Sequence, residues 1–476
     1  MKYFILLFTL VNAFTLFAQV TPPTPILPIP TARQLKWQQQ ELVMFVHFTV
    51  NTYTDKEWGD GTEDPNIFNP VELDAEQWAR TAAECGFKTV ILTAKHHDGF
   101  CLWPSAYTDH SVKSSPWKDG KGDVVRELAN ACRKYNINMG IYLSPWDRHE
   151  TTYGQGEAYN QYYTAQLREL MSNYGELTEM WFDGANGEGP NGKVQVYDFD
   201  LFWSLVRQLQ PGVCMFSDAG PDVRWIGNEN GFAGETCWSM IDKSTVTIGK
   251  ANTAYLNSGD PDGKDWVPGE CDVSIRDGWF YHADQGPKSL DQLLDIYVKS
   301  VGRNSLLLLN VPPDRRGLFA EQDVTRLYEF RKALDSIFAT NLAHDAVALA
   351  SNTRGNSRQF FPDRIADGDP DTWWAADDTV REAYIDLDLG REREFNLVEL
   401  CEPIAMGQRI SRYDVQAKVN DDWHVICEGT TIGNKRLHTL APHKARYIRI
   451  TIHGARACPI LSEFGLYHSK YVEFKL

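Results

Sequence analysis

The sequence lacks three features that would point to particular classes of protein. After the first eighteen residues no stretch approaches eighteen consecutive apolar residues, so we expect no membrane-spanning helix. Basic residues are scarce: 47 Lys and Arg stand against 64 Asp and Glu, a net charge of -17 that argues against nucleic acid or an anionic membrane as the main partner. The 9 cysteines form no closely spaced metal-binding pair, and their odd number excludes complete pairing within the chain. We therefore expect mostly buried thiols.

The first thirty-one residues predict export and a linker. Residues 1–18 hold one early lysine followed by an apolar run from Tyr3 to Leu10, a pattern typical of a secretory signal peptide. The mature chain is thus expected to be exported, either periplasmic or secreted. Residues 19–31 contain the proline-rich stretch Pro22 to Pro30 and predict a stiff linker.

Between Leu42 and Pro313, short apolar strands alternate with amphipathic helical segments. We expect strands at Leu42–Phe48, Lys88–Ala94, Asn138–Ser144, Thr178–Phe182, Val213–Ser217, Thr236–Met240, Cys271–Ile275 and Leu306–Val311. We expect helices at Asp74–Cys85, Asp123–Tyr135, Ala158–Tyr174, Asp198–Leu209, Lys288–Val301 and Glu321–Ala339. This alternation favours a parallel sheet, and about eight strands favour a closed TIM-like (β/α)8 barrel over residues 32–341. Because residues 220–286 are rich in glycine and weak in helical signals, we expect an irregular barrel.

The pattern changes after the helix that ends near Ala339. Short apolar runs separated by turn-rich pieces predict an antiparallel β sandwich, of the jelly-roll kind, over residues 342–476. These runs are Glu382–Leu387, Asn396–Cys401, Tyr413–Lys418, His424–Cys427, Arg446–Ile452 and Phe464–Tyr467.

One stretch of the barrel is the best candidate for an active centre. The predicted strand before it ends in Trp181-Phe182, and Asp183-Gly184 follows directly. In a parallel α/β barrel, catalytic side chains emerge at the carboxyl ends of the strands. On these residues alone the alternative, that Asp183-Gly184 merely starts a turn, carries equal weight.

Other strand ends and loops of the barrel also carry polar groups. They supply His47 and Glu57, then His96 and His97 in the run Lys95–Phe100, then Tyr142, and finally Glu229 in the loop Arg224–Gly231. If these ends converge on one mouth, two classes of enzyme could use the set.

The first class is a metal hydrolase and the second a glycosidase. A metal hydrolase would take His47, His96, His97 and Asp183 as ligands. A glycosidase would take two acids as nucleophile and general acid/base. Adjacent residues of a strand point to opposite faces, so His96 and His97 could share one metal only across a bulge or turn. Any one of these histidines could equally be a core residue.

Several blocks of the chain, in order, resemble the α-L-fucosidases of glycoside hydrolase family 29. They are Lys95–Phe100 with Trp103–Ser105, Trp181–Gly184, and Ser305–Pro313. The resemblance covers roughly residues 32 to 340. It implies a retaining exo-glycosidase on an irregular barrel, with fucosylated oligosaccharides or glycoconjugates as substrates and no cofactor in catalysis.

The resemblance also implies roles for single residues. The aspartate of the Trp-Phe-Asp-Gly block, Asp183, would be the nucleophile. Gly227-Asn228-Glu229 resembles the branch that prefers α1,3- and α1,4-linked fucose, so Glu229 would be the acid/base, with Glu235 as the competing choice. Substrate-binding roles carry over to His47, Glu57, His96, His97, Tyr142 and Trp279, with Arg224 and Trp225 shaping the pocket of Glu229. The residues after His47 depart from the commoner family form, which leaves linkage preference open.

The tail resembles a discoidin-like domain of the coagulation factor 5/8 type C kind, also seen as a carbohydrate-binding module. The residues that carry this resemblance are Ala366–Ala375 and Leu461–Gly465. It implies one structural calcium, for which the candidate ligands are Asp367, Asp369, Thr372 and Glu463. A solvated acidic loop is an equal alternative.

Three hypotheses for the whole chain follow. The first is an exported α-L-fucosidase. The second is another hydrolase, metal-dependent or acting on a different sugar. The third is a glycan-binding protein without activity, against which the presence of both Asp183 and Glu229 speaks.

Overall fold

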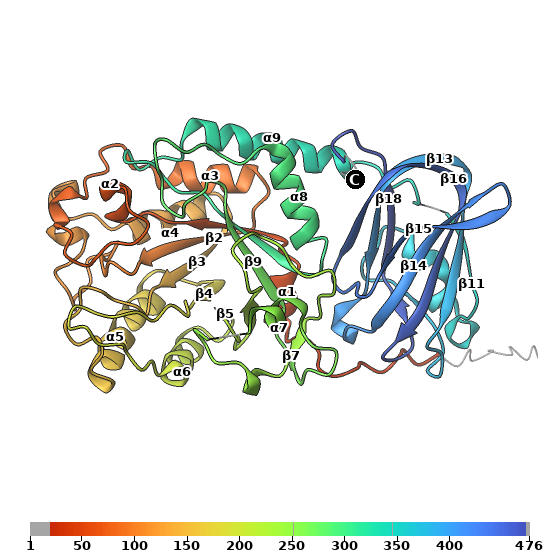
Figure 1. Ribbon diagram of the computed structural model, residues 1–476, viewed down its shortest axis with the longest axis horizontal. Helices are drawn as coiled ribbons and strands as arrows, with labels where there is room; N and C mark the ends of the chain where they lie inside the picture. The colour runs from red at the N-terminus through yellow and green to blue at the C-terminus, as the bar shows by residue number, and fades with distance from the viewer. Residues whose placement is uncertain (1–19, 251, 345, 473–476) are drawn as a thin grey trace, which may run out of the picture.

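Two units of different architecture make up the molecule, an α/β barrel and a β sandwich (Figure 1). The computed structural model describes residues 20–250, 252–344 and 346–472. The signal peptide expected at residues 1–18 lies outside the described residues.

The barrel is one closed ring of parallel strands, as expected. Its order around the ring is β1-β10-β9-β6-β5-β4-β3-β2. The strands are β1 Leu42–Val46, β2 Thr89–Lys95, β3 Asn138–Leu143, β4 Glu179–Trp181, β5 Cys214–Ser217, β6 Val223–Trp225, β9 Gly269–Ser274 and β10 Leu306–Asn310. Val43 of β1 pairs with Leu308 on one side and Thr89 on the other, so the first strand closes the ring against the last.

The prediction of the sixth barrel strand was wrong. It falls at Val223–Trp225, within a segment expected to begin a loop, while the expected strand Thr236–Met240 contributes only to the short outer pair β7 Met240–Ile241 and β8 Asp265–Trp266. Residues 218–222 join β5 to β6 directly, without the helix that usually separates parallel strands. The barrel is therefore irregular in the region where glycine is frequent.

The outer helices are α1 Ala32–Gln38, α2 Asn51–Thr54, α3 Ala75–Glu84, α4 Val124–Lys134, α5 Glu157–Asn173, α6 Phe199–Leu209, α7 Thr253–Ser258, α8 Leu290–Ser300 and α9 Glu321–Ile337. The six predicted helices, α3, α4, α5, α6, α8 and α9, begin and end close to the predicted positions, whereas the short helices α1, α2 and α7 were not predicted. Asp74, Asp123 and Asp198 begin α3, α4 and α6 because each carboxylate accepts backbone N–H groups of the first turn. The buried faces of these helices form a large apolar core with the outer face of the strands.

The interior of the barrel is aromatic, and two buried acids lie within it. Trp181 stacks on Phe216 with ring centroids 4.1 Å apart. Its indole Nε1 donates to Glu270 (2.8 Å), while Trp37 of α1 donates to Glu179 (2.8 Å). Burial raises the pKa of both glutamates, and each carboxyl group keeps one buried oxygen that has no hydrogen-bond partner among the described residues.

The second unit is an antiparallel sheet in the order β11-β13-β16-β14-β15, with β18 paired to β13. Its strands are β11 Val347–Ala350, β13 Ala383–Cys401, β14 Ile410–Val419, β15 Asp422–Gly429, β16 Arg436–Ala455 and β18 Glu463–Tyr467. Two short strands, β12 Trp374–Ala375 and β17 Ile460–Leu461, pair with each other in a separate sheet. The expected run Asn396–Cys401 lies within the long strand β13, and so does all of Glu382–Leu387 except its first residue. Register shifts along β13 and β16 bend both strands around a separate apolar core.

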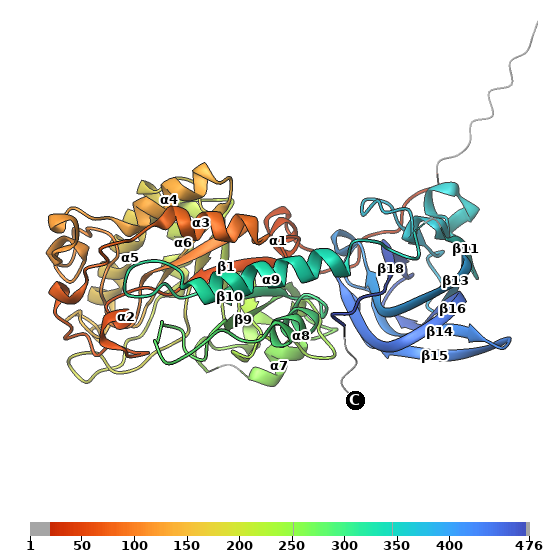
Figure 2. The same ribbon diagram turned by 90° about the horizontal axis from the view of Figure 1, so that it is seen from above.

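The sandwich packs against the amino-terminal end of the barrel. Asn304, just before β10, accepts the N–H of Asn434 (2.8 Å), and Leu437 of β16 donates to Gly302 (2.9 Å). Lys435 bridges the units by pairing with Glu41 of the barrel (2.6 Å) and Glu399 of the sheet (3.3 Å). The blue unit in Figures 1 and 2 therefore lies at the opposite end of the barrel from the carboxyl ends of its strands.

The proline-rich segment expected to be a linker is attached to the sandwich. Ile26 donates to Met406 (3.0 Å), and Arg409 and Arg354 donate to the carbonyls of Thr24 and Thr21 (both 2.6 Å). In Figure 1 it runs along the lower side of the sandwich before it enters α1. The segment thus spans both units.

Two further expectations concern cysteines and membranes. All nine cysteines are free thiols, and all except Cys401 and Cys427 are buried. Within the described part of the chain, no helix has both the length and the apolar character needed to cross a bilayer.

Replacing Lys435 by methionine is expected to weaken the contact between the units. Glu41 and Glu399, whose side chains are 28% and 11% exposed, would then lack their cation. We expect the free energy of unfolding to fall by about 2 kcal/mol, below the range for fully buried pairs because of this partial exposure. Urea denaturation measures the change. Lys444→Met, on strand β16, which Lys435 directly precedes, is the matched control, since Lys444 is 62% exposed and pairs with Glu394 at the surface. Equal losses in the two variants would contradict the role of Lys435.

Candidate active site

A cavity of about 630 Å³ opens at the carboxyl ends of the barrel strands. It is lined by all but one of the predicted catalytic and substrate-binding residues: His47, Glu57, His96, His97, Tyr142, Asp183, Trp225, Glu229 and Trp279. The exception is Arg224. Residues from seven different segments of the sequence therefore meet at one site because the strands run parallel.

Asp183 lies two residues beyond β4, with both carboxylate oxygens engaged. The phenol of Tyr142 donates to Oδ2 (2.7 Å), and the backbone N–H of Ala185 donates to Oδ1 (2.8 Å). The side chain is still 23% exposed to the cavity. These donors fix the direction of the carboxylate while leaving one side of it accessible.

His47 and His97 are held in defined tautomers. Asn310 uses its amide N–H groups on Ser274 and on the carbonyl of Trp279, so its Oδ1 accepts from His47 Nδ1 (2.9 Å). Burial, the largest influence, lowers the pKa of His47 to about 3. His47 is therefore neutral, and its Nε2 is a hydrogen-bond acceptor.

The same logic applies to His97. Ser144 donates its hydroxyl proton to the carbonyl of Trp146 (2.7 Å), so its Oγ accepts from His97 Nδ1 (2.8 Å). Burial lowers the pKa of His97 to about 4, although Asp183 opposes this effect. The free Nε2 lies 3.7 Å from Asp183 Oδ2. Both histidines can accept a hydrogen bond from a sugar hydroxyl.

His96 and His97 line the same cavity, whereas a regular strand would have separated them. Strand β2 ends at Lys95, and its pairing with β3 shifts register between Thr93 and Lys95. The two rings consequently lie 4.0 Å apart. Nevertheless, no group of three or more His, Cys, Asp or Glu side chains in the described ranges is placed to hold a metal ion.

Glu229 lies four residues beyond β6, on the same cavity as Asp183. Its Oε2 accepts the indole N–H of Trp279 (3.2 Å). Burial raises the pKa of Glu229, the Trp279 hydrogen bond lowers it, and the nearby Asp183 and Glu57 raise it further. An acid with a raised pKa beside an aspartate is suited to donating a proton.

Glu57 holds the loop that carries Trp279. Its carboxylate accepts from the backbone N–H groups of Trp279 (2.7 Å) and Phe280 (3.3 Å), and it contacts His282 Nε2 (2.6 Å). The ring of Trp279 lies 5.1 Å from that of His47. Glu57 therefore positions one aromatic wall of the cavity in addition to lining it.

Arg224 does not reach the cavity, which corrects the prediction that it helps to bind substrate. Its fully buried guanidinium donates to the carbonyls of Leu256 (2.8 Å), Trp238 (2.8 Å) and Val267. Its neighbour Trp225, which was also predicted, does line the cavity, and its Nε1 donates to Asp272 (2.9 Å).

Glu235, the competing acid, lies away from the cavity. It pairs with Arg303 and with Arg436 of the sandwich (3.0 Å), and its side chain is 71% exposed. Of the two glutamates only Glu229 shares a cavity with Asp183.

Among the lining residues that the sequence prediction missed are Trp58, Asp218 and Asp272. Trp58, 59% exposed, lies at the rim 6.2 Å from the His97 ring. Asp218 directly follows strand β5, so the rule that found Asp183 could have found it. Asp272 lies inside β9, where nothing in the sequence distinguishes it from a core position. Burial raises the pKa of Asp218 to about 6.

The calcium candidates lie in one region of the sandwich. Thr372 donates to Asp367 (2.9 Å), and Asp367 also accepts the backbone N–H of Asp369 (3.0 Å). Burial raises the pKa of Glu463 to about 7, and Glu399, Asp367 and Asp369 raise it as well. Within the described residues, however, the three acids do not form a group placed to hold a metal ion by themselves.

Comparison with known proteins gives two family matches. Residues 31–336 match the α-L-fucosidase family model, and residues 348–464 match that of the F5/8 type C domain.

Individual relatives cover nearly the whole chain. An Arabidopsis thaliana protein named alpha-L-fucosidase 1 is 50% identical over 453 residues, 94% of this chain and 89% of its own. The solved structure of SpGH29 superposes with a TM-score of 0.90 at 42% identity, covering 94% of this chain and 100% of that one. A Ruminococcus gnavus GH29 fucosidase solved in complex with fucose superposes with a TM-score of 0.89 at 36% identity, covering 96% and 98%.

Proposed function

The chain belongs to the α-L-fucosidase family of glycosidases, and on that premise we propose that it is a retaining exo-enzyme that releases terminal α-L-fucose through a covalent intermediate. The observation that carries the proposal is the pairing of Asp183 and Glu229 on one cavity, in environments that differ. Asp183 accepts two short hydrogen bonds that orient its carboxylate, whereas burial raises the pKa of Glu229.

In the first step the carboxylate of Asp183 attacks the anomeric carbon. The bond from that carbon to the glycosidic oxygen breaks, and Glu229 transfers its proton to the departing oxygen. The product is a fucosyl ester of Asp183. The ionised Glu229 then takes a proton from water, whose oxygen attacks the same carbon and releases Asp183. Two inversions retain the configuration.

Neutral histidines and aromatic rings support binding of the sugar. The free Nε2 atoms of His47 and His97 accept hydrogen bonds from sugar hydroxyls, and His96 and Glu57 line the same cavity. Trp225 and Trp279 offer apolar faces to the sugar ring and its methyl group. None of these steps uses a metal or an organic cofactor.

For the linkage we propose α1,3- and α1,4-linked fucose in branched glycans. Support comes from the Gly227-Asn228-Glu229 block and from a second cavity of about 490 Å³ that shares Glu229, Asp277 and Trp279 with the first. This second cavity could bind the sugars to which the fucose is attached. The N-terminal pattern supports export, to the periplasm or the medium, as part of the same proposal.

The first test compares fucose release by the wild type, Asp183→Ala and Glu229→Ala. The substrates are an aryl α-L-fucoside and an oligosaccharide with α1,3- or α1,4-linked fucose. We expect kcat to fall at least about 10³-fold for Asp183→Ala on both substrates, because no nucleophile remains. For Glu229→Ala the loss should be larger on the oligosaccharide, whose leaving group needs the proton.

Two controls test the assignment of Asp183 and Glu229. Glu235→Ala is the matched acid substitution and should retain activity on both substrates. Azide should restore activity to Asp183→Ala with inverted product. Full activity of Asp183→Ala, or loss of activity in Glu235→Ala but not in Glu229→Ala, would contradict the assignment. Release of fucose from the aryl substrate alone would refute the linkage proposal.

Trp279→Phe is expected to move the basic limb of the pH profile of kcat/KM to higher pH. The indole N–H stabilises the charged form of Glu229, so its removal raises the pKa of the acid. We expect a shift of about half a pH unit, since the hydrogen bond is long and exposed. Trp225→Phe is the control, because that indole donates to Asp272 instead. A limb that stays in place or moves down in Trp279→Phe would count against Glu229 as the acid.

We also propose that the sandwich binds one structural calcium through Asp367, Asp369, Thr372 and Glu463. At a hundred times the dissociation constant, calcium should stabilise this unit by about 2.7 kcal/mol. Differential scanning calorimetry with EDTA, then with excess calcium, measures the shift, which Asp367→Asn should abolish. An identical transition in both conditions would refute the site.

A further inference from the structure

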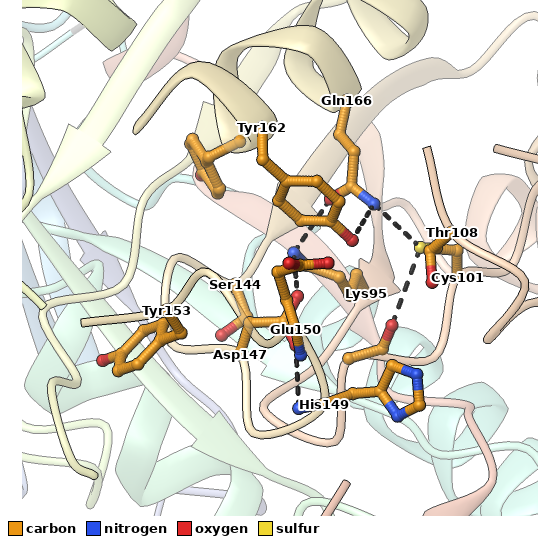
Figure 3. Close-up of polar contacts among 12 residues, drawn as sticks. Lys95, Cys101, Thr108, Ser144, Asp147, His149, Glu150, Tyr153, Tyr162 and Gln166 are labelled. Atoms are coloured by element: carbon orange, nitrogen blue, oxygen red, sulfur yellow. Dashed lines mark hydrogen bonds and ion pairs between the residues drawn. The ribbon is translucent and has the colours of Figure 1, made fainter. Parts of the chain in front are cut away.

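A buried ion pair lies just outside the cavity, behind the histidines. Lys95 Nζ lies 2.9 Å from Asp147 Oδ2, and both side chains are at most 1% exposed. The ammonium also donates to Gln166 Oε1 (2.9 Å) and lies 5.5 Å from the ring of Tyr162. Figure 3 shows Lys95 between Gln166 and Asp147. Charges buried this deeply are costly unless every partner is present.

The other oxygen of Asp147 organises a loop. Oδ1 accepts the backbone N–H groups of His149 (3.0 Å) and Glu150 (2.9 Å), as Figure 3 shows. A Cβ atom on Gly99 would lie 2.4 Å from this oxygen, and the φ of Gly99 is +79°. The glycine that follows the two histidines thus makes room for the carboxylate.

The loop of residues 144–150 holds His97 from several sides. Its first residue, Ser144, accepts from His97 Nδ1, and its backbone N–H donates to the carbonyl of Lys95 (3.0 Å). Arg148 donates its N–H to the carbonyl of His97 (2.9 Å), and the Trp146 ring lies 4.8 Å from that of His97. The position of this loop therefore decides which nitrogen of His97 faces Asp183.

The loop also supports the rim of the cavity near Trp58. Arg148 Nη1 donates to the carbonyl of Gly59 (2.5 Å), and His149 Nδ1 contacts that of Gly61 (2.7 Å). These two residues end the segment that carries Glu57 and Trp58. The Lys95–Asp147 ion pair, acting through this loop, therefore supports both His97 and the rim of the cavity.

We propose that Lys95 and Asp147 are positioning residues, which act through loop 144–150 to hold His97 in its Nδ1–H tautomer beside Asp183. The catalytic consequence rests on the proposed function. The orientation of His97 is independent of the proposed function, because it follows from the hydrogen bonds alone.

The test uses the double variant Lys95→Met/Asp147→Asn in the full chain. Asparagine keeps the Oδ1 that caps the loop, and the pair becomes neutral, so no unpaired charge is left buried. We expect thermal stability close to that of the wild type but kcat/KM on a fucoside at least tenfold lower, because a small misplacement of a reacting group is costly. Lys435→Met is the matched control: it should lose stability yet keep kcat/KM within twofold.

A spectroscopic measurement separates positioning from general damage. The ¹⁵N spectrum of histidine-labelled protein, with His97→Gln for assignment, should show a protonated Nδ1 and a free Nε2 for His97 in the wild type. In the double variant we expect loss of this single tautomer. Either an unchanged His97 signal or a kcat/KM within twofold of the wild type overturns the proposal.

Further variants cover the cases in which the double variant does not fold or the wild type is inactive. If the double variant does not fold, Lys95→Gln/Asp147→Asn, a neutral pair whose side chains can still hydrogen-bond, carries the same measurements. Ser144→Ala, which removes the acceptor directly, should give the same kinetic loss, and adding it to the double variant should give little more. If the wild type releases no fucose, the proposed function fails, while the His97 signal still tests the ion pair.

Discussion

The seam between β1 and β10 is the contact on which the site depends. Four residue pairs, from Leu42 with Leu307 to Phe45 with Asn310, join the first barrel strand to the last. Asn310, at the end of the seam, accepts both the backbone N–H and the Nδ1–H of His47. Its amide also holds the carbonyl of Trp279. Closure of the ring and orientation of the cavity are therefore parts of one hydrogen-bond pattern.

The two ends of the barrel have different roles. The carboxyl ends of the strands carry the acids and histidines, and the amino ends receive the sandwich through Asn304 and Lys435. Between them, Trp181 links the cavity to the buried glutamate pair below. The sandwich can thus stabilise the barrel without touching the reacting groups.

Much of this arrangement was predictable because strand ends in a parallel barrel have a recognisable pattern. An apolar run followed by polar groups located His47, His97 and Asp183, and the order of the blocks gave the family. The failures have physical causes. Strand β6 is only three residues long and follows β5 without a helix, so neither periodicity nor spacing marks it. Thr236–Met240 has the apolar residues of a strand, but Cys237, Trp238 and Met240 are buried in clusters outside the barrel sheet.

The direction in which a side chain points was the property hardest to predict from the sequence. Arg224 and Trp225 are neighbours on β6, and only the fold decides that the arginine turns to backbone carbonyls while the indole faces the cavity. The partners of Lys95 are equally hidden, since Asp147 and Gln166 lie far along the chain. Such contacts depend on tertiary packing, about which local sequence carries little information.

The central claim is that Asp183 forms a covalent bond to the sugar. The most direct measurement treats the protein with a 2-deoxy-2-fluoro-L-fucosyl fluoride, whose fluorine slows hydrolysis of the intermediate, and identifies the labelled peptide by mass spectrometry. We expect one fluorofucosyl group per chain, attached to the peptide that contains Asp183. A label on any other residue, or inactivation without a covalent adduct, would contradict it.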